Sequence, residues 1–358
     1  MFCTNCGTEV SKLDNYCQHC GELVHGYSRI VKRWNTNQSP NPPGQFDSVE
    51  NLKQKLLEEY GGKDFKEIIK GREVKNSQGS CFIIEDKKAI SLKKIDAGRA
   101  KSKIASDLKL IYGIGKITET ELKKEGYSNI YQLKAHPRFG KEAAELVKLL
   151  DSISADKVAS WICRWVSKSH PLVFCCSAFS NIQDYIILDI ETLGLYNKPI
   201  ILIGMGKLKD GYIHTRQYLI RDLEEEAAIL SHFITNIEKN NAFITFNGLM
   251  FDIPFLQERL YFYGIPFNLS RLNYDILHFS RRVWKHKFEN YKLETLENLL
   301  LGVNRKMDLP STYVPDFYRS YLSTKNIGPL IPIIEHNKQD IISLANLFAK
   351  ISEEWETF

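Results

Sequence analysis

The feature that most constrains the fold is an apolar segment that ends in two acids, DYIILDIE at residues 184–191. Its length and its β-branched residues predict a buried strand. Because alternate residues of a strand share a face, Asp189 and Glu191 would present two carboxylates side by side, while Leu188 and Ile190 would face the opposite layer. Carboxylates this close repel one another unless a cation lies between them.

The segments that follow predict a mixed sheet flanked by helices, which is an α/β fold. Residues 200–206 and 212–219 read as two strands of a meander, because an Asp-Gly turn separates them. The next residues predict a helix, a short buried strand and a second helix, at 222–238, 242–246 and 250–263.

Two further acidic residues lie on helices that the sequence predicts. Asp252 lies in the first turn of the helix expected at 250–263, shortly after Asn247. His336 and Asp340 are four residues apart and would share one face of a later helix. Hard oxygen ligands without cysteine favour Mg²⁺ or Mn²⁺ over Zn²⁺. Two such ions can activate a water and stabilise a leaving 3′ oxygen, which predicts phosphodiester hydrolysis.

The sequence motifs around these acidic residues resemble those of a known family. Residues 180–358 resemble the ribonuclease H-like superfamily, specifically its DEDD-type 3′→5′ exonucleases and, within these, the YprB-type domain family. The matching strings lie at residues 189–195, 246–252, 296–300 and 336–344.

The resemblance implies that Asp189, Glu191 and Asp340 bind a catalytic metal ion. Asp189 would also touch a second ion, which Asp252 would reach through water. Asn247 would position the strand end.

His336 is the expected general base, since an imidazole accepts protons near neutral pH. It precedes Asp340 by four residues, the step of the Tyr-type enzymes, whereas His-type enzymes usually have five. The alternative is that His336 only orients water or caps the helix. Asp275 has two open interpretations as well, a fifth acid near the metal ions or a structural hydrogen-bonding residue.

The N-terminus contains two CxxC pairs, each followed by glycine, and this spacing is typical of a structural zinc site. The pairs are Cys3 with Cys6 and Cys17 with Cys20. Residues 1–26 resemble the short zinc-ribbon family. So short a segment buries little apolar surface, so Zn²⁺ would supply the folding energy. The ribbon would bind nucleic acid or a protein partner, and the Pro-rich residues 27–46 predict a linker.

The middle of the chain predicts two more units. Residues 47–100 read as a small α+β segment, with a helix at 52–60 and a hairpin formed by 80–84 and 89–92. In residues 101–168, Gly113, Gly115 and Lys116 lie between two helix-like runs, and this arrangement resembles a helix-hairpin-helix module.

In that family a Gly-x-Gly turn points backbone N–H groups at a phosphate. Gly113, Gly115 and Lys116 form such a turn, and residues 101–148 carry ten Lys/Arg against six Asp/Glu. The alternative is a plain helical hairpin with a glycine turn.

A second basic segment lies within the acidic half of the chain. Arg281, Arg282 and Lys285 surround Trp284 in a run that could follow a nucleic-acid backbone. The alternative is a solvated helix face on which Trp284 anchors the helix to the core.

Charge is unevenly distributed along the 358 residues. Residues 1–179 have a net charge of +8 and residues 180–358 of −3, so the basic half would hold a polyanion and the acidic half would hold metal ions. Ordinary surface variation gives the same numbers. The chain shows no basic and apolar leader and no apolar run of ~18 residues, which predicts a cytoplasmic protein without a membrane span.

The sequence therefore predicts a metal-dependent nuclease, a 3′→5′ exonuclease on DNA with single-stranded 3′ ends, with RNA as a possible substrate. It would use two Mg²⁺ or Mn²⁺ ions and one structural Zn²⁺. The rivals are a nucleic-acid-binding adaptor without activity and a scaffold that reaches a repair or replication complex through the zinc ribbon.

Overall fold

The structure is a computed structural model that describes residues 45–305 and 309–355. The four cysteines of the expected zinc ribbon and most of the expected linker lie outside these residues. The described part contains a seven-stranded sheet in the order β1-β2-β5-β4-β3-β6-β7. The strands are β1 (Arg72–Asn76), β2 (Gly79–Ala89), β3 (Tyr185–Thr192), β4 (Ile200–Lys209), β5 (Tyr212–Leu219), β6 (Ala242–Thr245) and β7 (Asn273–Asp275).

The centre of the sheet is the meander that the sequence predicts. Strand β4 pairs antiparallel with both β3 and β5. Asp210 and Gly211 connect β4 to β5 with positive φ values of 52° and 78°. A two-residue turn of this kind matches the twist of the strands that it joins. Strands β6 and β7 extend the sheet in parallel beside β3, so the sheet is mixed as expected.

The hairpin near the N-terminus is part of the same sheet. Strand β2 pairs antiparallel with β5 from Phe82 to Ala89, and β1 then forms the edge. The expectation of a separate segment at 47–100 therefore differs from the structure, and the expected hairpin strands at 80–84 and 89–92 are wrong in extent. The physical reason is the free edge of β5, because β2 satisfies its backbone N–H and C=O groups from about 130 residues away in the chain.

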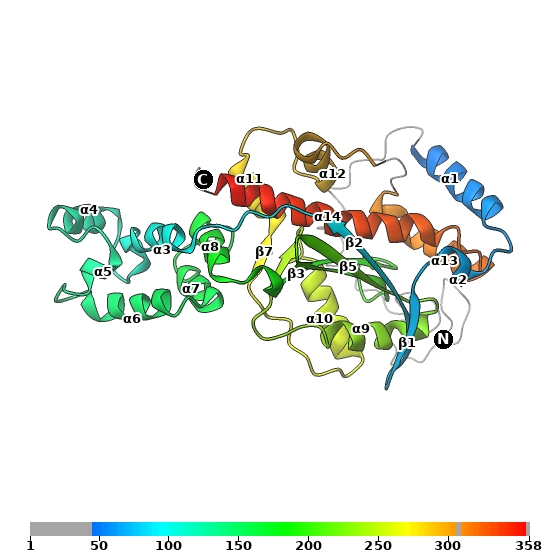
Figure 1. Cartoon of the computed structure of the whole chain (residues 1–358), viewed down its shortest axis with the longest axis horizontal. Helices are drawn as coiled ribbons and strands as arrows, with labels where there is room; N and C mark the ends of the chain where they lie inside the picture. Colours follow the sequence, from blue (N-terminus) through cyan, green and yellow to red (C-terminus); the bar gives the residue numbers. More distant parts are fainter. Residues whose placement is uncertain (1–44, 306–308, 356–358) are drawn as a thin grey trace, which may run out of the picture.

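Helices cover both faces of the sheet (Figure 1). The long helix α14 packs on β3, β4 and β5 from one face, and α9 and α10 pack on the other. The helices outside the module described next are α1 (Gln45–Glu59), α2 (Phe65–Ile68), α9 (Glu226–Ile234), α10 (Asp252–Phe262), α11 (Ile276–Val283), α12 (Leu293–Leu296), α13 (Val314–Thr324) and α14 (Leu330–Glu354). The expected helix at 222–238 is shorter, because a 3₁₀ turn at Leu223–Glu225 precedes α9.

A helical module lies to one side of the sheet, at the left in Figure 1. Its members are α3 (Ala97–Ala105), α4 (Lys116–Lys124), α5 (Ile130–Leu133), α6 (Gly140–Asp151), α7 (Ala155–Ile162) and α8 (Pro171–Cys175). The module and the sheet share one hydrophobic core. The buried ring of Phe174 in α8 contacts Phe279 and Phe348, with centroids 5.0 and 5.4 Å away. The module is therefore packed against the sheet rather than tethered to it.

Helices α4, α5 and α6 make up the outer part of this module (Figure 1). Gly115 stands at the N-cap of α4, and Gly113 has a φ of 79°, which favours glycine. The backbone N–H of Tyr112 donates to the carboxylate of Glu142 in α6 at 3.1 Å. This hydrogen bond thus links the turn before α4 to helix α6.

No helix in the described part of the chain is long and apolar enough to cross a membrane.

Candidate active site

Two carboxylates of the site come from β3. Asp189 and Glu191 point to the face covered by α14, while Leu188 and Ile190 pack into the core on the other face. This is the alternation that the sequence predicts. Asp189 stands opposite Gly204 of β4 in the sheet. A Cβ atom at Gly204 would lie 2.1 Å from Oδ1 of Asn337, so the glycine leaves room for that amide.

Helix α14 supplies the next two side chains. His336 and Asp340 lie one turn apart on the helix, and both are buried. Between them, Asn337 donates from Nδ2 to Oδ2 of Asp189 at 2.8 Å. Its Oδ1 accepts from Nε2 of Gln217 at 2.9 Å. Asn337 therefore joins the strand carboxylate to the helix, a role that the sequence alone did not indicate.

The fourth carboxylate lies at the start of α10. Asp252 is the first residue of that helix, and its Oδ1 accepts from the backbone N–H of Ile190 at 3.1 Å. Asn247 precedes it with a φ of 59°. Asp275 accepts from the backbone N–H of Asn247 at 2.8 Å and of Leu249 at 3.3 Å. The structural interpretation of Asp275 thus fits: it holds the turn and does not line the cavity described next.

The four carboxylates and His336 line one cavity of about 640 Å³. Its walls come from β3, the turn before α10, α14 and the segments around Lys292 and Ser311. The remaining lining residues are Ile190, Thr192, Gly194, Leu195, Phe246, Asn247, Phe251, Lys292, Leu293, Glu294, Arg305, Ser311, Thr312, Pro315. The acids that are distant in sequence therefore share one cavity.

Burial and mutual repulsion raise the pKa values of these acids. Burial raises the pKa of Asp189 well above its ordinary range, and the charges of Asp340, Glu191 and Asp252 add to this. Burial also raises the pKa of Glu191 to about 8 and that of Asp252 to about 7. For Asp340 burial raises the pKa, while His336 and Arg305 oppose the shift. An ionised cluster of this kind favours the binding of cations or protons.

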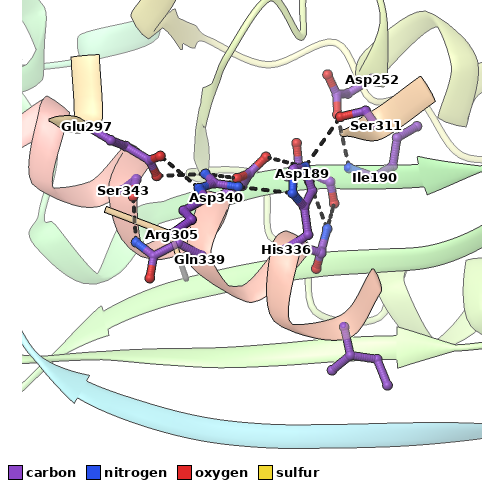
Figure 2. Close-up of polar contacts among 12 residues, drawn as sticks. Asp189, Ile190, Asp252, Glu297, Arg305, Ser311, His336, Gln339, Asp340 and Ser343 are labelled. Carbon is purple, nitrogen blue, oxygen red and sulfur yellow. Dashed lines mark hydrogen bonds and ion pairs between the residues drawn. The ribbon is translucent and has the colours of Figure 1, made fainter. Parts of the chain in front are cut away.

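Arg305 supplies one such cation, and sequence reasoning missed it (Figure 2). Its Nη2 donates to Oδ1 of Asp340, and its Nη1 donates to Nδ1 of His336 at 3.0 Å. Glu297 holds the same guanidinium through two bonds of 2.8 and 2.7 Å. Arg305 lies in an irregular segment without periodicity, so no sequence pattern marks it. The one signal that could have led to it is its partner Glu297, which lies in the motif at residues 296–300.

The Arg305 contact determines the tautomer of His336. A guanidinium can only donate, so Nδ1 of His336 accepts and Nε2 carries the proton of the neutral ring. Nε2 lies 3.3 Å from Oγ of Ser311 and 3.6 Å from Oδ2 of Asp340. His336 can therefore take up a proton when Nδ1 is released from Arg305 or the ring changes tautomer.

In the described part of the chain, no group of three or more His, Cys, Asp or Glu side chains is arranged as a metal site. Protein groups already bind three of the acids: Asn337 binds Asp189, the Ile190 backbone binds Asp252, and Arg305 binds Asp340. The donors themselves fit Mg²⁺ or Mn²⁺, because all four are carboxylates in one cavity. An ion bound at Asp340 would share that carboxylate with the guanidinium of Arg305.

The residues expected to contact nucleic acid lie away from this cavity. In the helical module, Gly113 and Gly115 lie in the turn before α4, and Lys116 is the first residue of that helix. Trp284 is buried and donates to the carboxylate of Glu354, as expected of a core anchor.

The basic side chains around Trp284 are exposed. Arg281, Arg282 and Lys285 lie at the surface near the end of α11. Arg282 donates to the hydroxyl of Ser167 at 2.8 Å and to that of Ser169 at 3.1 Å. Both serines belong to the helical module.

Comparison with known proteins finds similarities for the part of the chain that carries the cavity. Residues 186–352 match the family described as RNase_H superfamily. The chain is also similar to the "Uncharacterized protein YprB" of Bacillus subtilis (strain 168), with 28% identity over 181 residues. That match spans 49% of this chain and 43% of the length of the relative. The seven-stranded mixed sheet flanked by helices is consistent with both findings, so residues 186–352 are similar to the RNase H superfamily in sequence and in sheet architecture.

Proposed function

We propose that this protein is a metal-dependent nuclease, in the first instance a 3′→5′ exonuclease that degrades DNA, with RNA as a second possible substrate. One observation carries the proposal: four carboxylates from β3, α10 and α14 line a single cavity of an RNase H-like domain. Nucleic-acid hydrolysis is the activity that such a domain suggests, and the acids supply the negative charge that its cations require.

Asp189, Glu191, Asp252 and Asp340 are the residues that would hold two Mg²⁺ or Mn²⁺ ions. Bound there, the ions would supply positive charge that activates water and stabilises the leaving oxygen. The protein supplies the geometry. Asn337 orients Asp189, and the Ile190 backbone orients Asp252.

His336 is the candidate general base. Its ring lies in the wall of the same cavity, one helical turn from Asp340. It would accept the proton of the attacking water once a ring nitrogen is available, and Ser311 is placed to hold the ring through Nε2.

The other parts of the chain would hold the substrate. The turn at Gly113, Gly115 and Lys116 would direct backbone N–H groups to phosphates, and Arg281, Arg282 and Lys285 would follow the strand. Cys3, Cys6, Cys17 and Cys20 would bind one structural Zn²⁺.

A second candidate is a nucleic-acid-binding adaptor without activity. The bond between Arg305 and Asp340 favours it, because a protein cation occupies part of the acid cluster. Both candidates bind nucleic acid, and they differ in cleavage.

A strand panel with Mn²⁺ tests the choice between them. Labelled DNA and RNA with single-stranded, blunt and flapped 3′ ends are incubated with the wild type and with Asp189→Asn. Asp210→Asn, in the exposed β4–β5 turn, is the matched control. The proposal predicts shortening from the 3′ end by the wild type and Asp210→Asn, and at least ~100-fold less with Asp189→Asn. Binding without cleavage of any strand would support the adaptor.

A further inference from the structure

Arg305 is bound more completely than an ordinary surface arginine. Its side chain is only 9% exposed, and that of its partner Glu297 is 1% exposed. The guanidinium forms two parallel bonds to Glu297, one bond to Asp340 and one to His336. It thus connects a carboxylate outside the cavity with two side chains that line it.

The two carboxylates hold the guanidinium in different ways. Glu297 takes the fork-to-fork geometry, the strongest and most specific one for an arginine–carboxylate pair. The short π-helical segment Glu297–Leu301 carries this glutamate, and it packs against α14. Asp340 contributes a single oxygen. If one contact is given up, the structure favours loss of the contact to Asp340, since Glu297 can still neutralise the charge.

The position of Arg305 also conflicts with a divalent ion at Asp340. A guanidinium and an ion that share one carboxylate repel each other, and the cavity wall around them is largely shielded from solvent, so water screens this repulsion poorly. Without the arginine, however, Asp340 would face Asp189, Glu191 and Asp252 in the same cavity without the guanidinium that now offsets their charge. The same side chain therefore stabilises the metal-free cluster and opposes the ion.

We propose that Arg305 is a displaceable counter-ion: it holds Asp340 in the metal-free protein, and a divalent ion binds at Asp340 by displacing it onto Glu297. This inference rests on the proposed metal site and names the residues that regulate it. Arg305 is a positioning residue in this scheme, since it acts on the acids and not on the substrate.

Two other roles for Arg305 predict different changes in metal-free stability and in ion affinity when the arginine is removed. If Arg305 only held the fold together, its removal would lower stability and would not tighten ion binding. If Arg305 oriented Asp340 for the ion and stayed in place, its removal would weaken ion binding. Only a displaceable counter-ion predicts that removal lowers metal-free stability and strengthens ion binding together.

The experiment measures Mn²⁺ affinity by calorimetry and by the electron paramagnetic resonance of free Mn²⁺, without nucleic acid. The proteins are the full-length wild type, Arg305→Gln, Glu297→Gln and Arg259→Gln. Arg259 is the matched control, because it is equally buried and is held by Glu226 through bonds of 2.7 and 2.6 Å, yet it does not line the cavity. Unfolding by urea in EDTA gives metal-free stability for each variant.

Arg305→Gln is expected to bind Mn²⁺ roughly tenfold more tightly than the wild type, the scale of removing one positive charge near a divalent ion, and to unfold at lower urea in EDTA. Glu297→Gln is expected to bind Mn²⁺ severalfold more weakly, because the guanidinium then depends on Asp340. Arg259→Gln should lose stability with unchanged affinity.

If Arg305→Gln binds Mn²⁺ as tightly as the wild type or more weakly, the counter-ion inference is overturned, but the proposed metal site is not. If that variant does not fold, equal or tighter binding by Glu297→Gln overturns it instead. Absence of Mn²⁺ binding in all variants would overturn the proposed metal-dependent activity together with this inference.

Discussion

Replacement of Glu191 by glutamine should stabilise the metal-free protein while it abolishes the proposed activity. Glu191 is 5% exposed, and burial raises its pKa from 4.5 to about 8, with further contributions from Asp340 and Asp252 that His336 partly offsets. A raised carboxyl pKa means that the native state binds the proton more tightly than the unfolded state does. The contribution of this group to stability therefore falls as the pH rises from 4.5 to about 8.

The size of the effect follows from the same shift. At pH 7 the carboxyl group is 2.5 pH units above its ordinary pKa and still below the native one, which corresponds to about 3 kcal/mol at 1.36 kcal/mol per unit. At pH 5.5 the same reasoning gives about 1 kcal/mol. Glutamine has nearly the same shape and does not titrate, so Glu191→Gln should gain these amounts relative to the wild type.

Urea unfolding in EDTA at pH 5.5, 7 and 8.5 measures this difference. Glu335→Gln is the control, because Glu335 is an exposed residue of α14 whose charge pairs with Lys338, and its change should stay below about 0.5 kcal/mol. Addition of Mn²⁺ should stabilise the wild type more than Glu191→Gln. A variant that is no more stable than the wild type at pH 7, or a difference that does not grow with pH, would refute the repulsion argument.

Three further predictions concern the support of the site. Gly204→Ala should destabilise the protein by about 2–3 kcal/mol, seen by thermal unfolding, because the new Cβ displaces Asn337 and so frees Asp189; an unchanged melting temperature would contradict this. Phe174→Ala should cost about 3–5 kcal/mol and expose the helical module to proteases, since the ring lies in the core that the module shares with the sheet; unchanged protease resistance would argue against joint packing. His336→Gln should lower the cleavage rate ~100-fold with Mn²⁺ affinity retained, if His336 is the base; a loss below about threefold would remove that role.

The sequence predicts best where a side-chain pattern is local. Alternation along 184–191 was enough to place Asp189 and Glu191 on one face and Leu188 and Ile190 on the other. Helical spacing placed His336 and Asp340 one turn apart, and α14 has both on the face toward the cavity. Short-range geometry determines each of these placements.

Long-range pairing could not be predicted in this way. Strand β2 pairs with β5 across about 130 residues, and its own residues show nothing that selects β5 as a partner. The helical module was expected as a separate unit, and it is buried against the sheet through residues such as Phe174, which looks like any apolar residue in the sequence. Tertiary contacts of this kind leave little trace in periodicity.

Arg305 and Asn337 show the same limit within the site. Arg305 lies in an irregular segment between α12 and α13, where no spacing relates it to Asp340. Asn337 follows His336 directly, and its role depends on the glycine at 204, which the sheet register places opposite Asp189. The acids could be found from their chemistry, whereas the groups that hold them required coordinates.

The proposed function requires that the carboxylates of this cavity together hold divalent cations, and anomalous diffraction from crystals soaked in Mn²⁺ detects such ions. We expect a peak in the cavity about 2.0–2.3 Å from carboxylate oxygens of Asp189, Glu191 and Asp340, with Arg305 moved away from Asp340 and still bound to Glu297. A cavity without a peak at millimolar Mn²⁺, with Arg305 still on Asp340, would contradict it.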